Sequence, residues 1–185
     1  MSVHIETPRT LIRELLPEDE AGMFAMDSDP EVHRFVGRRP LSSVDESRAV
    51  ISFVRGQYIT KGIGRWAIVL RETGEFVGWT GFKLIENMVN GYSGHYDFGY
   101  RLAQKYWGKG LATEASRAAL EYGIATLGLK NIYAMTDVNN NASRQVLEKL
   151  GFRLIEIFAY DAEPDWRDTG DPTTWYKLDP AGTVR

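Results

Sequence analysis

Two runs of β-forming residues separated by a short turn dominate the middle of the chain. Residues 65–70 (RWAIVL) and 76–85 (FVGWTGFKLI) flank a turn at Glu72, Thr73, Gly74 and Glu75. Apolar, β-branched and aromatic runs joined in this way predict an antiparallel hairpin. The fold must therefore contain a β-sheet.

Helical and strand patterns alternate around this hairpin. A short strand-like run near residues 11–15 precedes three helix starts, at Pro17, Ser28 and Ser42, so we expect the first third to be mostly helical. After the hairpin the periodicity predicts strand 92–102, helix 110–127, strand 131–138, helix 140–150 and two closing strands. No repeat or linker interrupts this order. We therefore expect residues 1–185 to form a single α+β domain with a mixed sheet.

Composition excludes several classes of function. The chain has 185 residues and no cysteine, which rules out cysteine nucleophiles, thiolate zinc sites and iron–sulfur clusters. Its net charge of −3 lacks the basic excess typical of nucleic-acid binding. The longest apolar run, Trp66–Leu70, is far shorter than the roughly 20 residues that span a bilayer. We expect a cytoplasmic protein with no metal, no nucleic-acid partner and no membrane partner.

The segment 104–115 (QKYWGKGLATEA) lies between a predicted strand and a predicted helix. A strand, a glycine-rich turn and a helix N-terminus together favour anion binding, because amides point inward and the helix end carries about half a positive charge. The segment is not a Walker A loop, since Gly110 follows Lys109, and Thr113 replaces the third glycine of a dinucleotide fingerprint. An ordinary glycine turn before a helix is the alternative.

This loop is one of five recognisable segments that are spread over nearly the whole chain: residues 7–13, GWTGF, DFGYRL, YWGKGLATEA and NNNASRQVLEKLGF. Together they resemble the GNAT superfamily of acetyl-CoA-dependent N-acetyltransferases, and within it the RimJ/RimL-like family. The resemblance implies a mixed, mostly antiparallel sheet of about six to seven strands with about four helices. It also implies acetyl transfer to a primary amine, on a protein N-terminus or a small molecule, by direct attack in a ternary complex.

By this resemblance, acetyl-CoA binds along one strand and the loop that follows it. The strand from Phe98 to Leu102 hydrogen-bonds the pantetheine and splays from the next strand, and the loop amides bind the pyrophosphate. Lysine stands at 105 where the family usually has Gln or Arg. The implied cofactor-binding residues are Phe98, Gly99, Tyr100, Arg101, Leu102, Lys105, Tyr106, Trp107, Gly108, Lys109, Gly110, Leu111, Ala112, Asn140, Ser143 and Arg144. A helix N-cap is the alternative for Asn140, and a solvated surface charge for Arg144.

Candidate catalytic residues follow from the chemistry of amide formation, which needs a neutral amine and a proton for the leaving thiolate. Asp97 is the candidate base, with an acidic residue on an exposed strand face or in an ion pair with a neighbouring arginine as its alternative, and His95 is a second candidate. Leu147 occupies the position of the usual family tyrosine. The resemblance therefore indicates Ser143 as proton donor, and helix capping is its alternative. We expect Glu114 to stabilise the helix or pair locally.

The acceptor side is predicted from an acidic segment between the closing strands. Asp161, Glu163, Asp165, Asp168 and Asp171 surround Trp166, which suits a cationic acceptor, although a solvated loop has the same composition. The remaining tryptophans Trp66, Trp79 and Trp107 are predicted to pack in the core or against the cofactor. A catalytically idle acyl-CoA-binding module and an ordinary nucleotide-phosphate binder are the alternative functions, and either a monomer or a homodimer is compatible with the sequence.

Overall fold

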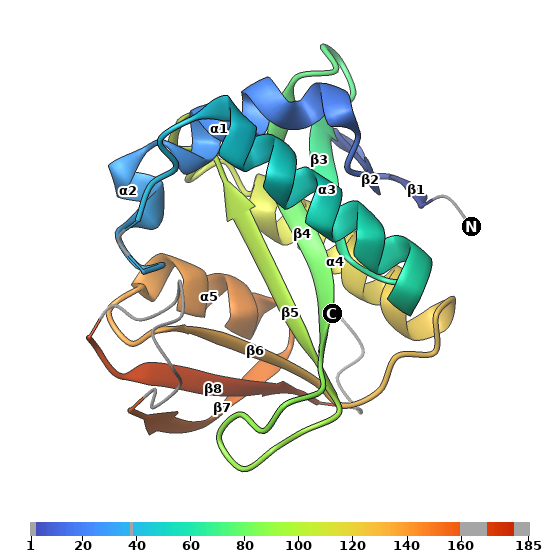
Figure 1. Cartoon of the computed structure of the whole chain (residues 1–185). Helices are drawn as coiled ribbons and strands as arrows, with labels where there is room; N and C mark the ends of the chain where they lie inside the picture. The colour runs from blue at the N-terminus through green and yellow to red at the C-terminus, as the bar shows by residue number, and fades with distance from the viewer. Residues whose placement is uncertain (1–2, 38, 160–169, 180–185) are drawn as a thin grey trace.

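One mixed sheet organises the computed structural model, which describes residues 3–37, 39–159 and 170–179 (Figure 1). Within these residues the sheet has eight strands in the order β1-β2-β3-β4-β5-β6-β8-β7, and all neighbours are antiparallel except β5 and β6. The strands are β1 (His4–Glu6), β2 (Thr10–Glu14), β3 (Arg65–Leu70), β4 (Phe76–Ile85), β5 (His95–Leu102), β6 (Ile132–Asp137), β7 (Phe152–Phe158) and β8 (Thr173–Leu178).

Five α-helices and two 3₁₀ turns accompany the sheet in the described residues. They are η1 (Pro17–Asp19), α1 (Glu20–Asp27), α2 (Pro30–His33), α3 (Val44–Lys61), η2 (Gln104–Tyr106), α4 (Leu111–Ala125) and α5 (Asn141–Lys149). Polar side chains begin three of these helices: Asp29, Ser43 and Asn140 each accept a hydrogen bond from a first-turn N–H. The alternation of helix and strand follows the predicted order.

The sheet separates two apolar cores. Trp66 and Ile68 of β3 point to the face covered by α4 and α5, where the larger core lies, and Ala67 between them points to the α1 and α3 face. Figure 1 shows α3 crossing the sheet on the side opposite α4. The alternating side chains of the predicted hairpin therefore hold helices on both faces.

The α+β class and the mixed sheet are confirmed, with one strand more than expected. β1 has three residues, too few for a period-2 pattern to be visible in the sequence. β5 begins at His95 rather than at Tyr92, because Val89 and Tyr92 form a separate bridge in the β4–β5 connection. Neither difference alters the sheet order.

β5 and β6 separate shortly after they meet. Their parallel pairing covers only Tyr96 with Ile132 and Asp97 with Tyr133, and the rest of β5 runs away from β6 (Figure 1). On its other edge β5 stays paired with β4 from His95 to Leu102. Beyond Asp97, β5 is thus not paired with β6 in the described sheet.

Candidate active site

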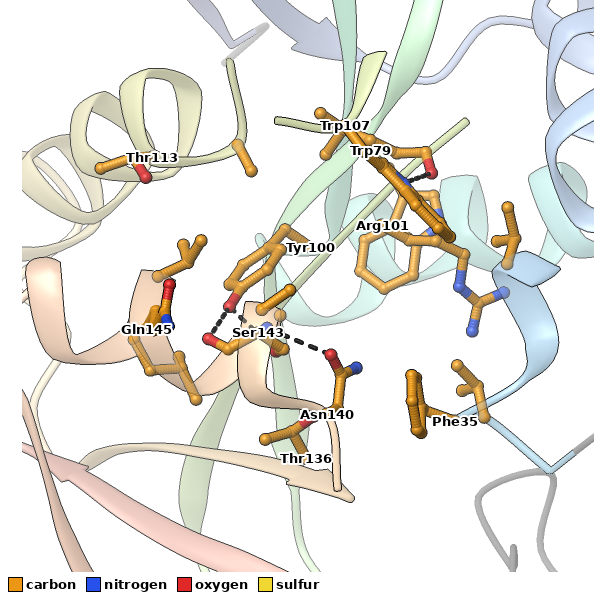
Figure 2. A pocket seen from close by; sticks show the side chains of 18 of the residues that line it. Phe35, Trp79, Tyr100, Arg101, Trp107, Thr113, Thr136, Asn140, Ser143 and Gln145 are labelled. Carbon is orange, nitrogen blue, oxygen red and sulfur yellow. Dashed lines mark hydrogen bonds between the residues drawn. The ribbon is translucent and has the colours of Figure 1, made fainter. Parts of the chain in front are cut away.

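A cavity of about 540 Å³ lies where β5 and β6 separate. It is lined by β5, the starts of α4 and α5, and the α2 segment (Figure 2). Because odd and even residues of β5 face opposite sides of the sheet, its lining includes side chains from both faces. We call the part near α4 and α5 the donor end, and the part near α2, Arg65 and Trp79 the acceptor end.

The glycine loop and the start of α4 form the wall of the donor end. Gly108 and Gly110 adopt left-handed φ values of 71° and 76°, which glycine reaches without strain. In the described chain α4 begins at Gly110 without a side-chain cap, and Leu111 and Ala112 line the cavity. Uncapped N–H groups at a helix N-terminus favour an anion. The donor end therefore favours an anionic group.

Most of the predicted cofactor-binding residues line the cavity: Phe98, Gly99, Tyr100, Arg101, Leu102, Tyr106, Trp107, Gly108, Gly110, Leu111, Ala112, Asn140 and Ser143. Lys105, Lys109 and Arg144 do not line it. The side chain of Lys105 pairs with Glu75 at the surface, and Lys109 Nζ lies 5.7 Å from the centroid of the Tyr106 ring. Arg144 also lies elsewhere, since its guanidinium donates to the Val138 carbonyl and the Tyr176 hydroxyl, at 3.2 and 3.3 Å.

Trp107 ties the glycine loop to the cofactor strand. Its indole Nε1 donates to the carbonyl of Leu102 at 2.7 Å, and 45% of the residue remains exposed at the cavity rim (Figure 2). Trp66, by contrast, is buried between Phe82 and Tyr122. Trp66 therefore lies in the core, one of its two predicted settings, and the packing of Trp107 against a cofactor stays a prediction.

The start of α5 brings Asn140 and Ser143 to the cavity. The Asn140 side chain accepts from the Ser143 N–H at 3.1 Å and so caps the helix (Figure 2). Ser143 is the third residue of α5, and the cap is made by Asn140 rather than by the serine hydroxyl. The capping alternative for Asn140 is therefore observed, and the one for Ser143 is not.

Tyr100 of β5 meets Ser143 from the opposite wall, an interaction the sequence did not reveal. Its hydroxyl donates to the Ser143 carbonyl at 2.7 Å and lies 3.0 Å from the Ser143 hydroxyl. A phenol carries one hydrogen, so when the carbonyl accepts it the serine is the donor to Tyr100. Burial raises the pKa of Tyr100, which keeps the phenol protonated. Tyr100 thus fixes the orientation of the Ser143 hydroxyl.

On the opposite face, Asp97 is paired with an arginine. Asp97 Oδ2 lies 2.5 Å from Arg65 Nη2, and the two side chains are only 9% and 12% exposed. Arg65 also donates to the Asp97 carbonyl at 2.9 Å. Asp97 lies at the last parallel pair with β6 and lines the cavity. The ion-pair alternative for Asp97 is thus present, and it holds the carboxylate at the point where the strands separate.

Trp79 lies in the acceptor end, where its ring contacts two arginines. The guanidinium carbons of Arg65 and Arg101 are 5.2 and 5.3 Å from its ring centroid, within range of a cation–π interaction. Arg101 Nη1 donates to Asp27 Oδ1 at 2.8 Å, and His33 Nε2 lies 3.6 Å from the same carboxylate. Burial raises the pKa of Asp27, but Arg101 and His33 outweigh burial and lower it overall.

The α2 segment forms the outer wall of the acceptor end, and sequence reasoning missed it. Glu31, Val32, Phe35 and Val36 line the cavity there, and Phe35 lies across from Asn140 in Figure 2. α2 has four residues, so no helical period could mark a face of it. A Pro30 start after an Asp29 cap was the only signal in the sequence.

His95 and Glu114, two further residues singled out in the sequence, do not line the cavity. His95 is buried edge-on to the rings of Tyr133 and Trp175, and it is not among the cavity-lining residues. Glu114 pairs with Arg9, which is far away in sequence rather than local as expected. The acidic residues Asp161, Glu163, Asp165 and Asp168 and the neighbouring Trp166 lie outside the described residues.

Residues 3–37, 39–159 and 170–179 contain no group of three or more His, Asp or Glu side chains placed to hold a metal ion. None of the helices in these ranges combines the length and the apolar character that crossing a membrane requires.

Comparison with known proteins places this geometry in a family. Residues 9–153 match the family model described as the acetyltransferase (GNAT) domain. The N-acetyltransferase p20 of Bacillus licheniformis is 31% identical over 147 residues, which cover 80% of this chain and 80% of that protein. The FsC-acetyl coenzyme A-N(2)-transacetylase of Aspergillus fumigatus is 30% identical over 174 residues, 89% of this chain and 73% of its own.

A solved structure shares the fold. RimL, a ribosomal L7/L12 alpha-N-protein acetyltransferase in complex with coenzyme A, superposes with a TM-score of 0.78 over 95% of this chain and 97% of its own. The two sequences are 15% identical, so the likeness concerns the fold alone.

Replacing Asp27 with asparagine tests the buried pair behind the acceptor end. Removing one partner of a buried ion pair costs about 3–5 kcal/mol, so we expect the free energy of unfolding at pH 7 to fall by that amount. The pKa of Asp27 is lower in the folded state than its ordinary 3.8. The contribution is therefore complete above about pH 4 and is lost as pH falls through the folded-state pKa. Urea denaturation at pH 7, 5 and 3 measures this, and a deficit that is equal at every pH would contradict it.

Proposed function

The chain belongs to the acetyltransferase (GNAT) domain family, and we propose that it transfers the acetyl group of acetyl-CoA to a primary amine. The observation that carries the proposal is one cavity reaching both faces of the sheet where β5 and β6 separate. Its donor end has glycine amides and an uncapped helix start, and its acceptor end has charged and aromatic side chains. A thioester and an amine bound at the two ends would meet beside β5.

The donor proposal rests on backbone groups. β5 from Phe98 to Leu102 has no parallel partner in β6, so its edge can hydrogen-bond the pantetheine as an added strand. The amides around Gly108 and Gly110 would hold the pyrophosphate. A relative is named an acetyl coenzyme A transacetylase, and a structure of the same fold contains coenzyme A. Both support acetyl-CoA as the donor.

The proposed chemistry is direct attack in a ternary complex. The neutral amine nitrogen forms a bond to the thioester carbon, the carbon–sulfur bond breaks, and the thiolate leaves. Before the attack Asp97, at the separation point, would accept the ammonium proton directly or through water, and the proton that the nitrogen loses after the attack would go to the thiolate or to water. Ser143 would turn its one hydroxyl hydrogen from Tyr100 to the departing sulfur, and so hydrogen-bond or protonate it. A thiol pKa near 8.5 allows the thiolate to leave without full protonation.

The finer assignments are proposals of the same kind. We propose that residues 1–185 are one acetyltransferase domain of the RimJ/RimL-like family, acting in the cytoplasm as a monomer or homodimer. The acceptor would be a protein α-amine or a small-molecule amine. The second candidate function is an idle acyl-CoA-binding module, which is favoured by Leu147 at the usual tyrosine position and by the pairing of Asp97 with Arg65.

Calorimetry and a thiol assay separate these functions. We expect CoA to bind, and acetyl-CoA to release free thiol only when an amine acceptor is present. The acceptor panel is N-terminal peptides, polyamines and amino acids. CoA binding without amine-dependent thiol release would favour the idle module. Competition by ATP would indicate a general nucleotide-phosphate site.

Ser143→Ala tests the proposed proton donor. We expect kcat to fall by about 10²-fold, at the lower end for acid–base groups because the thiolate is a fair leaving group. The melting temperature should change little, since Asn140 makes the cap. Ser116→Ala is a matched control: it removes a buried hydroxyl that bonds Thr80 at 3.1 Å, and Ser116 does not line the cavity. Equal kcat in both variants would exclude Ser143 from the chemistry.

Asp97→Asn tests the proposed base through its pH dependence. We expect kcat/KM at pH 7 to fall by about 10²–10⁴-fold for a lysine-like amine and less for an α-amine, which is already partly neutral at pH 7. The deficit should shrink as pH rises above the pKa of the acceptor amine, because a neutral amine has no proton to give up. A constant deficit from pH 6 to 10 would instead indicate damage from the lost Arg65 pair.

A further inference from the structure

A dense set of hydrogen bonds joins the β1–β2 turn to the first turn of α4. The Glu114 carboxylate accepts from the Thr7 hydroxyl at 2.7 Å, from the Arg9 N–H at 2.9 Å and from Arg9 Nε at 2.6 Å. Arg9 and Glu114 are 105 residues apart in the chain. The Glu114 side chain is 17% exposed and that of Arg9 49%. One carboxylate thus fixes both the backbone and the guanidinium of Arg9.

This fixed guanidinium also reaches the glycine loop. Arg9 Nη1 donates to the carbonyl of Lys109 at 2.9 Å, and Arg9 Nη2 lies 3.5 Å from where a Cβ on Gly110 would be. Of these three residues only Gly110 lines the cavity. Arg9 therefore contacts the loop from outside the cavity.

The contact from Arg9 determines which way the Lys109–Gly110 peptide faces at the donor end. In a planar trans peptide the carbonyl and the following N–H point in opposite directions, and no peptide bond in the described chain is cis. With the Lys109 carbonyl held toward Arg9, the Gly110 N–H must point the other way. Glycine at φ 76° has no Cβ to prevent this peptide from rotating. The hydrogen bond from Arg9 is then what selects the orientation.

We propose that Arg9 and Glu114 are positioning residues for the donor: Glu114 holds Arg9, and Arg9 orients the Lys109–Gly110 peptide so that its N–H faces the pyrophosphate. The inference rests on the proposed function, because it takes the pyrophosphate of CoA as the anion at this loop. It assigns Glu114 a role at the donor end, beyond helix stability.

One ligand with the pyrophosphate, CoA, and one donor without it, S-acetyl-pantetheine, distinguish positioning of the loop from general stability. In Arg9→Met we expect the Kd for CoA to rise about tenfold, the effect of one charge-assisted hydrogen bond. The kcat/KM with S-acetyl-pantetheine, a donor without a pyrophosphate, should stay unchanged. Glu114→Gln should weaken CoA binding in the same way, and Arg9→Lys should recover part of the loss, because one ammonium can reach the carbonyl but lacks the fork.

Arg71→Met is the matched control. Arg71 is 45% exposed, donates to the Thr7 carbonyl at 2.9 Å and pairs with Glu6 at 3.0 Å, so it holds the same turn without touching the loop. It should bind CoA as wild type does.

Each result has a separate meaning. Unchanged CoA affinity in folded Arg9→Met and Glu114→Gln overturns the positioning role while the proposed function stands. Equal losses with CoA and S-acetyl-pantetheine also overturn it, since they indicate general damage. No CoA binding by the wild-type protein would overturn the proposed donor, and the positioning role with it.

Discussion

Two residue pairs, Tyr96 with Ile132 and Asp97 with Tyr133, join β5 to β6 as parallel neighbours in the described sheet. Beyond them the edge of β5 is open inside the protein. Buried backbone groups need hydrogen-bond partners, so an open edge is stable where water or a ligand can reach it. The cavity provides that access, and Tyr100 bonded to Ser143 holds the start of α5 across the gap.

The charged side chains of β5 on the other face of the sheet also need partners. Odd residues of β5 bring Asp97 and Arg101 to a largely buried setting, where a lone charge would be very unfavourable. Each finds a partner on another element: Arg65 on β3 and Asp27 at the end of α1. The Arg101–Asp27 pair connects the acceptor end to α1, and the Asp97–Arg65 pair connects it to β3. The shape of the acceptor end therefore depends on the placement of α1 and α2.

A feature of the fold or of the site could be predicted when the residues that determine it lie close together in sequence. The hairpin, the glycine turn before α4 and the Asn140 start of α5 are set by residues close together in sequence, and they were predicted within a few positions. Arg9 with Glu114 pairs side chains that only the folded sheet brings together. β1 and α2 are too short to have a period. The α2 wall was missed because a helix of four residues shows no period. The Arg101–Asp27 pair was missed, and an arginine partner for Asp97 was left as an alternative, because both pairs join residues that are distant in sequence.

The two ends of the cavity differ in how the chain builds them, which explains why the donor is easier to infer than the acceptor. The donor end uses backbone amides, glycine conformations and the open edge of a strand, all properties of the fold itself. Many side chains are compatible with such a fold, as the likeness to RimL at 15% identity illustrates. The acceptor end uses side chains such as Phe35 and Trp79, whose identity can change without altering the sheet. Sequence and fold therefore constrain the donor end of the cavity more strongly than its acceptor end.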